Sequence, residues 1–258
     1  MISSTRPQSV SSVVHIMKTA IALLVTIAAL SSVATAQKKK KTSVKPQPAI
    51  LVQVKTAPPD SPLLSKQEQL LLDEINLARS NPAAYVTFLQ EYRTYYQDKL
   101  VHFPDGRVLV TNEGVAALDD AIAYLRTVSP ATAFEVKKGM VLSAKLHLDD
   151  MLKSGRDGHI GSDGSKPEDR MTRFGSWQDS VGEDIVYNSR TPRNDVIGLI
   201  IDDGVASRGH RKNIFKPTFK VIGISLGQPV KEKTRCVITF AGDFVDKSDS
   251  KTPTATKY

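Results

Sequence analysis

The chain has 258 residues, a formal net charge of +8 at pH 7 and one cysteine. A single cysteine excludes an internal disulfide, so the folded part must be held together by packing. The positive charge lies mainly near the N-terminus, because residues 61–245 hold as many Lys and Arg as Asp and Glu. This neutral stretch shows no recognised nucleic-acid-binding module, so we expect no nucleic-acid partner.

Residues 1–36 are predicted to be a leader and signal peptide. A basic start at Met17 precedes the apolar run Ile21–Leu30, and Ala34–Ala36 has the small-residue pattern of a signal peptidase site. A membrane-spanning helix needs about 20 apolar residues, and this run is shorter. We therefore expect cleavage after Ala36, no transmembrane segment afterwards, and a secreted or periplasmic location. Whether translation starts at Met1 or Met17 stays open.

Residues 37–64 are predicted to be an extended linker, since the Lys38–Lys41 run is followed by several prolines. Each lysine near an anionic surface adds about 1 kcal/mol of attraction. The linker is therefore either an arm that attaches to envelope polymers or lipid head groups, or only a solubilising spacer. A folded domain is predicted for residues 65–245, and a polar tail for 246–258.

Helices are predicted through the first part of this domain. Ser65 and Glu68 form a capping box, which predicts a helix that ends before Asn81-Pro82. Amphipathic patterns predict three further helices, at residues 83–96, 111–129 and 141–155. His147 lies on the apolar face of the last one, so we expect a packing or supporting role for it.

The second part changes from helix to strand. A capping box at Ser165–Glu168 predicts a short helix, and Thr191-Pro192 begins another that runs to Gly204. β-branched residues then predict paired strands at 221–228 and 234–245, with Cys236 as an inert thiol on the apolar face. Early helices and late strands indicate an α+β fold.

Three glycine-flanked segments carry the residues best suited to chemistry: His159, Glu183 and His210. Glycine allows tight turns and leaves room for close approach. Neutral imidazoles and a carboxylate are suitable ligands for zinc, with one position left for water or substrate. Imidazole also accepts other divalent metals, so the residue types do not decide which metal binds.

The order of several motifs resembles the CAP/SCP superfamily of cysteine-rich secretory, antigen and pathogenesis-related proteins, in its cysteine-poor bacterial form. The matching segments are EINLARSNP (with Asn76 and Arg79), GHIGSDGS, GEDI, SRGHRKNIF and IGISLG. The resemblance spans Ser65 to Phe244, with divergent residues at 100–138. It implies an αβα three-layer sandwich with a mostly antiparallel sheet, and a cleft lined by His159, Glu183 and His210.

The chain departs from the family at two acidic positions. Where the family often has a second glutamate, this chain offers Asp202 and Asp203. On a continuing helix Asp203 would share the inward face with Leu199, while Asp202 would lie about 100° away, so we expect Asp203 to complete the metal site. Asp184 replaces an asparagine of the family, and strand alternation predicts that it points away from Glu183.

Other interpretations of the same residues stay open. Arg208 and Arg211 could bind an acidic ligand, or they could pair with neighbouring acids while His210 only caps a helix. Ser162, His210 and Glu183 could form a hydrolase site, although no GxSxG nucleophile elbow is present.

The favoured function is a secreted, non-enzymatic CAP module that binds zinc or another divalent metal together with an envelope polymer, lipid or protein ligand. The two alternatives are a metal- or Ser/His-dependent hydrolase of the protease or esterase type, and an envelope protein tethered by its lysine arm. Oligomeric state is left open.

Overall fold

The computed structural model describes residues 63–227 and 234–247, which all belong to the second of two units, Leu51–Tyr258. The predicted signal peptide, the Lys38–Lys41 arm and the tail beyond Lys247 lie outside the described residues. Within the part of the chain that is described, none of the helices is both long enough and apolar enough to span a bilayer.

A four-stranded sheet forms the middle layer, with the strand order β4-β6-β7-β5. Neighbours β6 and β7, and β7 and β5, are antiparallel, whereas β4 and β6 are parallel. The sheet is therefore mostly antiparallel, as predicted, with one parallel pair at the β4 edge. The strands are β4 (Glu135–Val136), β5 (Gly175–Tyr187), β6 (Val221–Leu226) and β7 (Arg235–Asp246).

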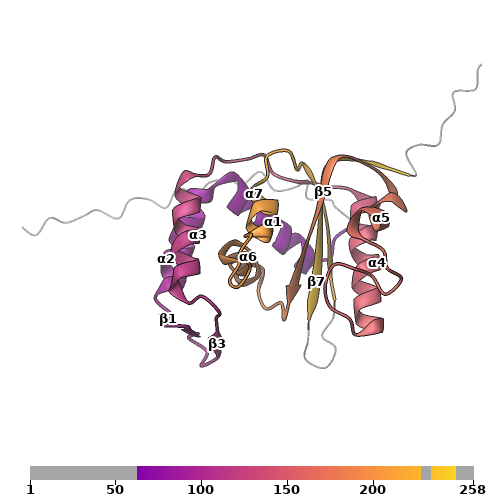
Figure 1. The fold of residues 1–258 in the computed structure, drawn as a ribbon. Helices are drawn as coiled ribbons and strands as arrows, with labels where there is room; N and C mark the ends of the chain where they lie inside the picture. Colours follow the sequence, from indigo (N-terminus) through magenta and orange to yellow (C-terminus); the bar gives the residue numbers. More distant parts are fainter. Residues whose placement is uncertain (1–62, 228–233, 248–258) are drawn as a thin grey trace, which may run out of the picture. The chain divides into compact units, whose positions relative to one another are not determined.

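Helices cover both faces of this sheet (Figure 1). One face packs against α4 (Lys138–Ser154) and α5 (Pro167–Thr172). The other packs against α1 (Lys66–Ser80), α6 (Pro192–Ile201) and α7 (Gly209–Phe215), and beyond these lie α2 (Pro82–Arg93) and α3 (Val115–Thr127). This arrangement confirms the predicted α+β fold with three layers.

Strand alternation divides the core between the two faces. Cys236, Ile238 and Phe240 are fully buried with α1, α6 and α7, whereas Val237 packs with α4. The thiol of Cys236 is buried as predicted, and burial raises its pKa well above the ordinary value. On the α4 face the backbone itself comes close: a Cβ at Gly223 would lie 2.1 Å from the carbonyl carbon of Met140.

The helix starts follow the predicted caps with one exception. The Ser65 amide donates to Glu68 at 2.7 Å, which completes the first capping box, and Thr191 caps α6 through the amide of Asn194. At α5 the cap is one residue later than predicted. The amide of Lys166, not that of Ser165, donates to a carboxylate three residues on, at Asp169.

The divergent segment after α2 contains an extra sheet that the sequence did not predict. Its antiparallel strands are β1 (Tyr96–Gln97), β2 (Leu100–His102) and β3 (Val108–Val110). Val101 and Phe103 are buried against the helices, whereas Val110 is 73 % exposed. One side of this three-stranded insert therefore packs on the rest of the domain.

Arg79, on the inward face of α1, joins three segments that are distant in sequence. Its guanidinium donates to the carbonyl oxygens of Thr132 (2.6 Å), Ile214 (2.5 Å) and Phe219 (2.5 Å), and lies 4.1 Å from the ring centre of Phe134. The side chain is fully buried, and desolvation lowers its pKa to about 10. Arg79 thus fixes the position of the end of α7 and of the residues that lead into β6.

We expect Arg79→Ala to lower the free energy of unfolding by at least about 3 kcal/mol, because it leaves buried carbonyl oxygens without donors. Arg126→Ala is the matched control, since Arg126 is exposed and is expected to change stability by less than about 0.5 kcal/mol. Urea unfolding measures both. Equal effects of the two substitutions would show that Arg79 does not hold the fold.

Candidate functional site

The site consists of two imidazole–carboxylate pairs on opposite sides of β5. Glu183 and Asp184 are neighbours in this strand, so their side chains point to opposite faces. Glu183 meets α5 through Arg170, at 2.7 Å, while Asp184 accepts a hydrogen bond of 2.7 Å from Asn213 in α7. The prediction that Asp184 points away from Glu183 is confirmed.

On the α4 and α5 side, Glu183 holds the first histidine. Its Oε1 lies 3.0 Å from Nδ1 of His159, and its Oε2 accepts from the guanidinium of Arg170. Arg170 also donates to the carbonyl oxygens of His159 and Ser165, so it ties the glycine-rich loop to β5. Arg170 is 1 % exposed, and its partners come from the glycine-rich loop and from β5. No local pattern in the sequence indicated this role.

His147 supports the same pair from α4. Its side chain is buried, with Nε2 2.8 Å from the carbonyl oxygen of Gly158 and 3.8 Å from Oε1 of Glu183. Its Nδ1 is buried without a hydrogen-bond partner among the described residues. Burial lowers the pKa of His147, which favours the neutral ring. The predicted packing and supporting role is confirmed.

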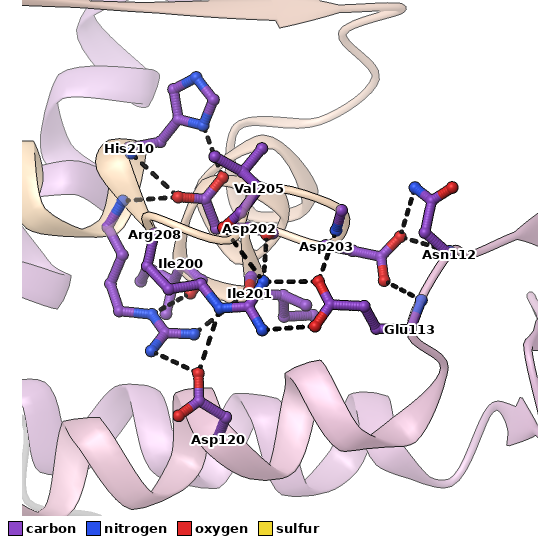
Figure 2. A network of polar contacts seen from close by, with 12 residues as sticks. Asn112, Glu113, Asp120, Ile200, Ile201, Asp202, Asp203, Val205, Arg208 and His210 are labelled. Carbon is purple, nitrogen blue, oxygen red and sulfur yellow. Dashed lines mark hydrogen bonds and ion pairs between the residues drawn. The ribbon is translucent and has the colours of Figure 1, made fainter.

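On the α6 and α7 side, Asp202 holds the second histidine (Figure 2). Its Oδ1 lies 2.6 Å from Nδ1 of His210, and its Oδ2 accepts from the amide of His210 at 3.0 Å. The hydrogen bond to Asp202 raises the pKa of His210 above its ordinary value. The imidazolium form is therefore stabilised.

Asp203 does not bind either histidine, and the prediction that it lies inward while Asp202 is more exposed is wrong. Asp202 is 3 % exposed, whereas Asp203 is partly exposed and accepts from the amides of Asn112 (2.6 Å) and Glu113 (2.8 Å), as Figure 2 shows. The reason is that α6 ends at Ile201 and Asp202 adopts a left-handed conformation, with φ of 56°. Helical periodicity does not extend past that residue.

Arg208 and Arg211 are engaged inside the domain, which corrects their predicted role in ligand binding. Arg208 donates to both carboxylate oxygens of Glu113, at 2.6 and 2.7 Å (Figure 2). Arg211 is 3 % exposed and donates to Asp120 and to the carbonyl oxygens of Ile200 and Ile201. Both arginines therefore connect the α6–α7 turn to α3 and to the residues just before α3.

Ser162 is not placed as a nucleophile. Its hydroxyl donates to the carboxylate of Asp150, and its amide donates to the same side chain at 2.7 Å. Among the described residues, no imidazole contacts this hydroxyl. Since an activated serine needs a base within hydrogen-bond reach, the predicted Ser162–His210–Glu183 arrangement is not formed.

Asp184 is a buried acid that would be protonated at neutral pH. Burial raises its pKa to about 8, and the charges of Asp202 and Glu183 act in the same direction. Its Oδ2 is buried without a hydrogen-bond partner in the part of the chain that is described. A protonated aspartic acid has nearly the shape of the asparagine that the resemblance leads us to expect there.

The predicted metal ligands do not form one centre. In residues 63–227 and 234–247, no group of three or more His, Cys, Asp or Glu side chains is arranged to hold a metal ion. The carboxylates instead occupy Nδ1 of each ring, as the partner of a metal-bound histidine usually does. The hydrogen bonds of both rings to other described side chains are made through Nδ1, not through Nε2. The described residues therefore offer single imidazole ligands and do not form a closed zinc site with four protein ligands.

A pocket of about 380 Å³ lies beside His210, between β5, α6 and the three-stranded insert. We call it the β5–α6 pocket. Its lining includes Tyr92, Phe103, Leu109, Ile185, Leu199 and His210. The lining combines these apolar side chains with polar and charged ones, among them Arg190, Asn194, Asp195, Asp202 and Asp203. Ligand pockets commonly combine apolar walls with polar groups that orient the ligand. His159 and Glu183 are absent from this lining, so the pocket belongs to the His210 pair.

Residues 120–237 match the model of the Cysteine-rich secretory protein family, CAP. This match confirms the resemblance over residues 120–237, although Asn76 and Arg79 lie before the matched residues.

Two solved structures are similar to the chain at low identity. An extracellular protein of Bacillus anthracis that contains an SCP domain is 19 % identical, with 47 % of this chain and 37 % of that chain covered and a TM-score of 0.35. An outer surface protein of Borrelia burgdorferi is 12 % identical, with 49 % and 89 % covered and a TM-score of 0.37. The chain thus spans little more than a third of the first protein. The comparison with curated proteins found no match.

We expect Asp202→Asn to lower the pKa of His210, because the substitution removes the negative partner. A base with a raised pKa stabilises the fold below its ordinary value of 6.5, and this contribution is lost as the pH rises through the raised value. The variant should therefore lose about 1 kcal/mol more stability at pH 5.5 than at pH 8.5. An NMR titration of the imidazole measures the pKa, and Asp203→Asn, which should leave it unchanged, is the control.

We expect Asp184→Asn to become more stable relative to the wild type as the pH rises. The unfolded acid ionises near its ordinary value of 3.8 and the folded one at about 8, so the wild type loses stability between these values. The difference should be on the order of a few kcal/mol, and denaturant unfolding at pH 4.5 and pH 8 measures it. A constant difference at both pH values would contradict a buried neutral acid.

Proposed function

We propose that this protein is an extracytoplasmic CAP-domain binding module, not a hydrolase, and that it binds its ligand at the His210 side of β5. The observation that carries the proposal is the β5–α6 pocket, with His210 in its lining and Asp202 behind the ring. The predicted signal peptide supports an exported location. The two similar solved proteins are described as extracellular and as an outer surface protein, which agrees with export.

The contacts of the polar side chains favour binding over hydrolysis. Ser162 is held by Asp150, and Glu183 is held by Arg170 and His159, so neither is free to act as nucleophile or base. What the pairs offer instead are oriented imidazoles. In the neutral ring, a carboxylate that accepts from Nδ1–H leaves Nε2 as the acceptor for a metal or a ligand donor. A metal at His210 must therefore displace the proton that Asp202 stabilises.

Divalent metal binding belongs to this proposal as a property of the separate rings. The side chain of His159 is 47 % exposed and that of His210 is 24 % exposed, so solvent reaches part of each ring. With water and ligand atoms as the remaining donors, such sites would exchange zinc readily. The lysine-arm alternative concerns residues outside the described part and stays a prediction.

We expect zinc titration of the mature chain to show binding that His159→Ala combined with His210→Ala removes. The control is His102→Ala, because His102 is exposed and its side chain has no contact among the described residues. Calorimetry with each protein measures the loss. Unchanged zinc binding in the double variant would refute the imidazole site, and turnover of peptide, ester or glycan substrates by zinc-loaded protein would refute the non-enzymatic function.

A further inference from the structure

The β5–α6 pocket has the chemistry of a site for a small organic anion. Its volume of about 380 Å³ lies near the lower end of the 300–1,000 Å³ range of ligand pockets, so a compact ligand fits better than a long chain. Ile185 and Leu199 form part of the wall on the domain side. Leu109 and Phe103 come from the insert, and Tyr92 meets Phe103 edge to face at 5.9 Å. The body of the ligand therefore meets aliphatic and aromatic surfaces.

The acids in the lining are all used inside the domain. Asp195 accepts from the hydroxyl of Ser189 and from the amide of Arg190, and burial raises its pKa. Asp202 is held by His210, and Asp203 by the amides that anchor the insert. The imidazole of His210 offsets the charge of Asp202, and burial favours the neutral form of Asp195. Asp203 keeps its charge, but its two oxygens are directed at the amides of Asn112 and Glu113.

Arg190 is the lining cation with free hydrogen-bond donors. Its guanidinium carbon lies 5.1 Å from the ring centre of Phe103, and none of residues 63–227 and 234–247 accepts a hydrogen bond from this guanidinium. Arg107 stacks on the same ring at 5.0 Å, but it is paired with Asp105 at 2.6 Å. A guanidinium that stacks on an aromatic ring still has N–H groups in its plane that can donate two parallel hydrogen bonds to a carboxylate.

We propose that the β5–α6 pocket binds a small aromatic carboxylate, with the acid group on Arg190 and the ring against Phe103 and the aliphatic wall. This inference rests on the proposed binding function and names the class of ligand. The insert, which contributes Phe103 and Leu109, makes the pocket a feature of this chain and not only of the helix-flanked sheet.

The test uses the mature chain with phenylacetate as the probe and phenylacetamide as its neutral counterpart. We expect phenylacetate to bind, and both Arg190→Gln and the change to phenylacetamide to weaken binding at least about ten-fold, because each removes a charge-assisted pair. Arg156→Gln is the matched control, since Arg156 is exposed and is not part of the lining. NMR chemical-shift titration measures affinity and shows whether Leu109 and Ile185 respond.

Several results would overturn this inference. They are equal binding of the acid and the amide, equal binding by the wild type and Arg190→Gln, or no binding of phenylacetate at millimolar concentration. Zinc titration of the same samples separates the two proposals. A wild type that binds zinc but not phenylacetate refutes the anion pocket alone, whereas one that binds neither refutes the proposed function as well. Retained zinc binding by Arg190→Gln also shows that this variant is folded.

Discussion

The buried guanidinium of Arg79 is the interaction on which the arrangement of this domain depends. A cation in the interior must be fully hydrogen-bonded, and here its donors are met by the carbonyl oxygens of Thr132, Ile214 and Phe219. All three carbonyl oxygens must lie close to the Arg79 side chain of α1 for its positive charge to be tolerated in the interior. Since Ile214 lies in α7, the same contacts fix the helix that begins with Gly209 and His210.

Strand β5 determines how the histidines are distributed. Its edge position gives helices access from both faces, and its alternation sends Glu183 to one face and Asp184 to the other. Each histidine then finds its own carboxylate, His159 on Glu183 and His210 on Asp202. The two histidines thus lie with carboxylates on different sides of the strand, which explains why the expected ligands remain two pairs.

Features set by local chemistry could be predicted from the sequence, and features set by distant partners could not. The cap at Ser65, the alternation around Cys236 and the buried place of His147 each depend on neighbours within a few residues. By contrast, Arg170 is explained only by Glu183 and by a loop that returns to it, and Arg208 only by Glu113 on a remote segment. No local sequence pattern predicts such contacts between distant residues.

The error at Asp203 shows how one backbone dihedral changes the function of two side chains. Because Asp202 ends α6 with positive φ, its carboxylate turns back to His210, and the next carboxylate turns out to the amides of Asn112 and Glu113. One acid therefore orients the imidazole while its neighbour anchors the insert that forms the opposite wall of the β5–α6 pocket. The spacing between His210 and the insert is thus set by two adjacent residues, so a shift of this turn would move both walls of the pocket together.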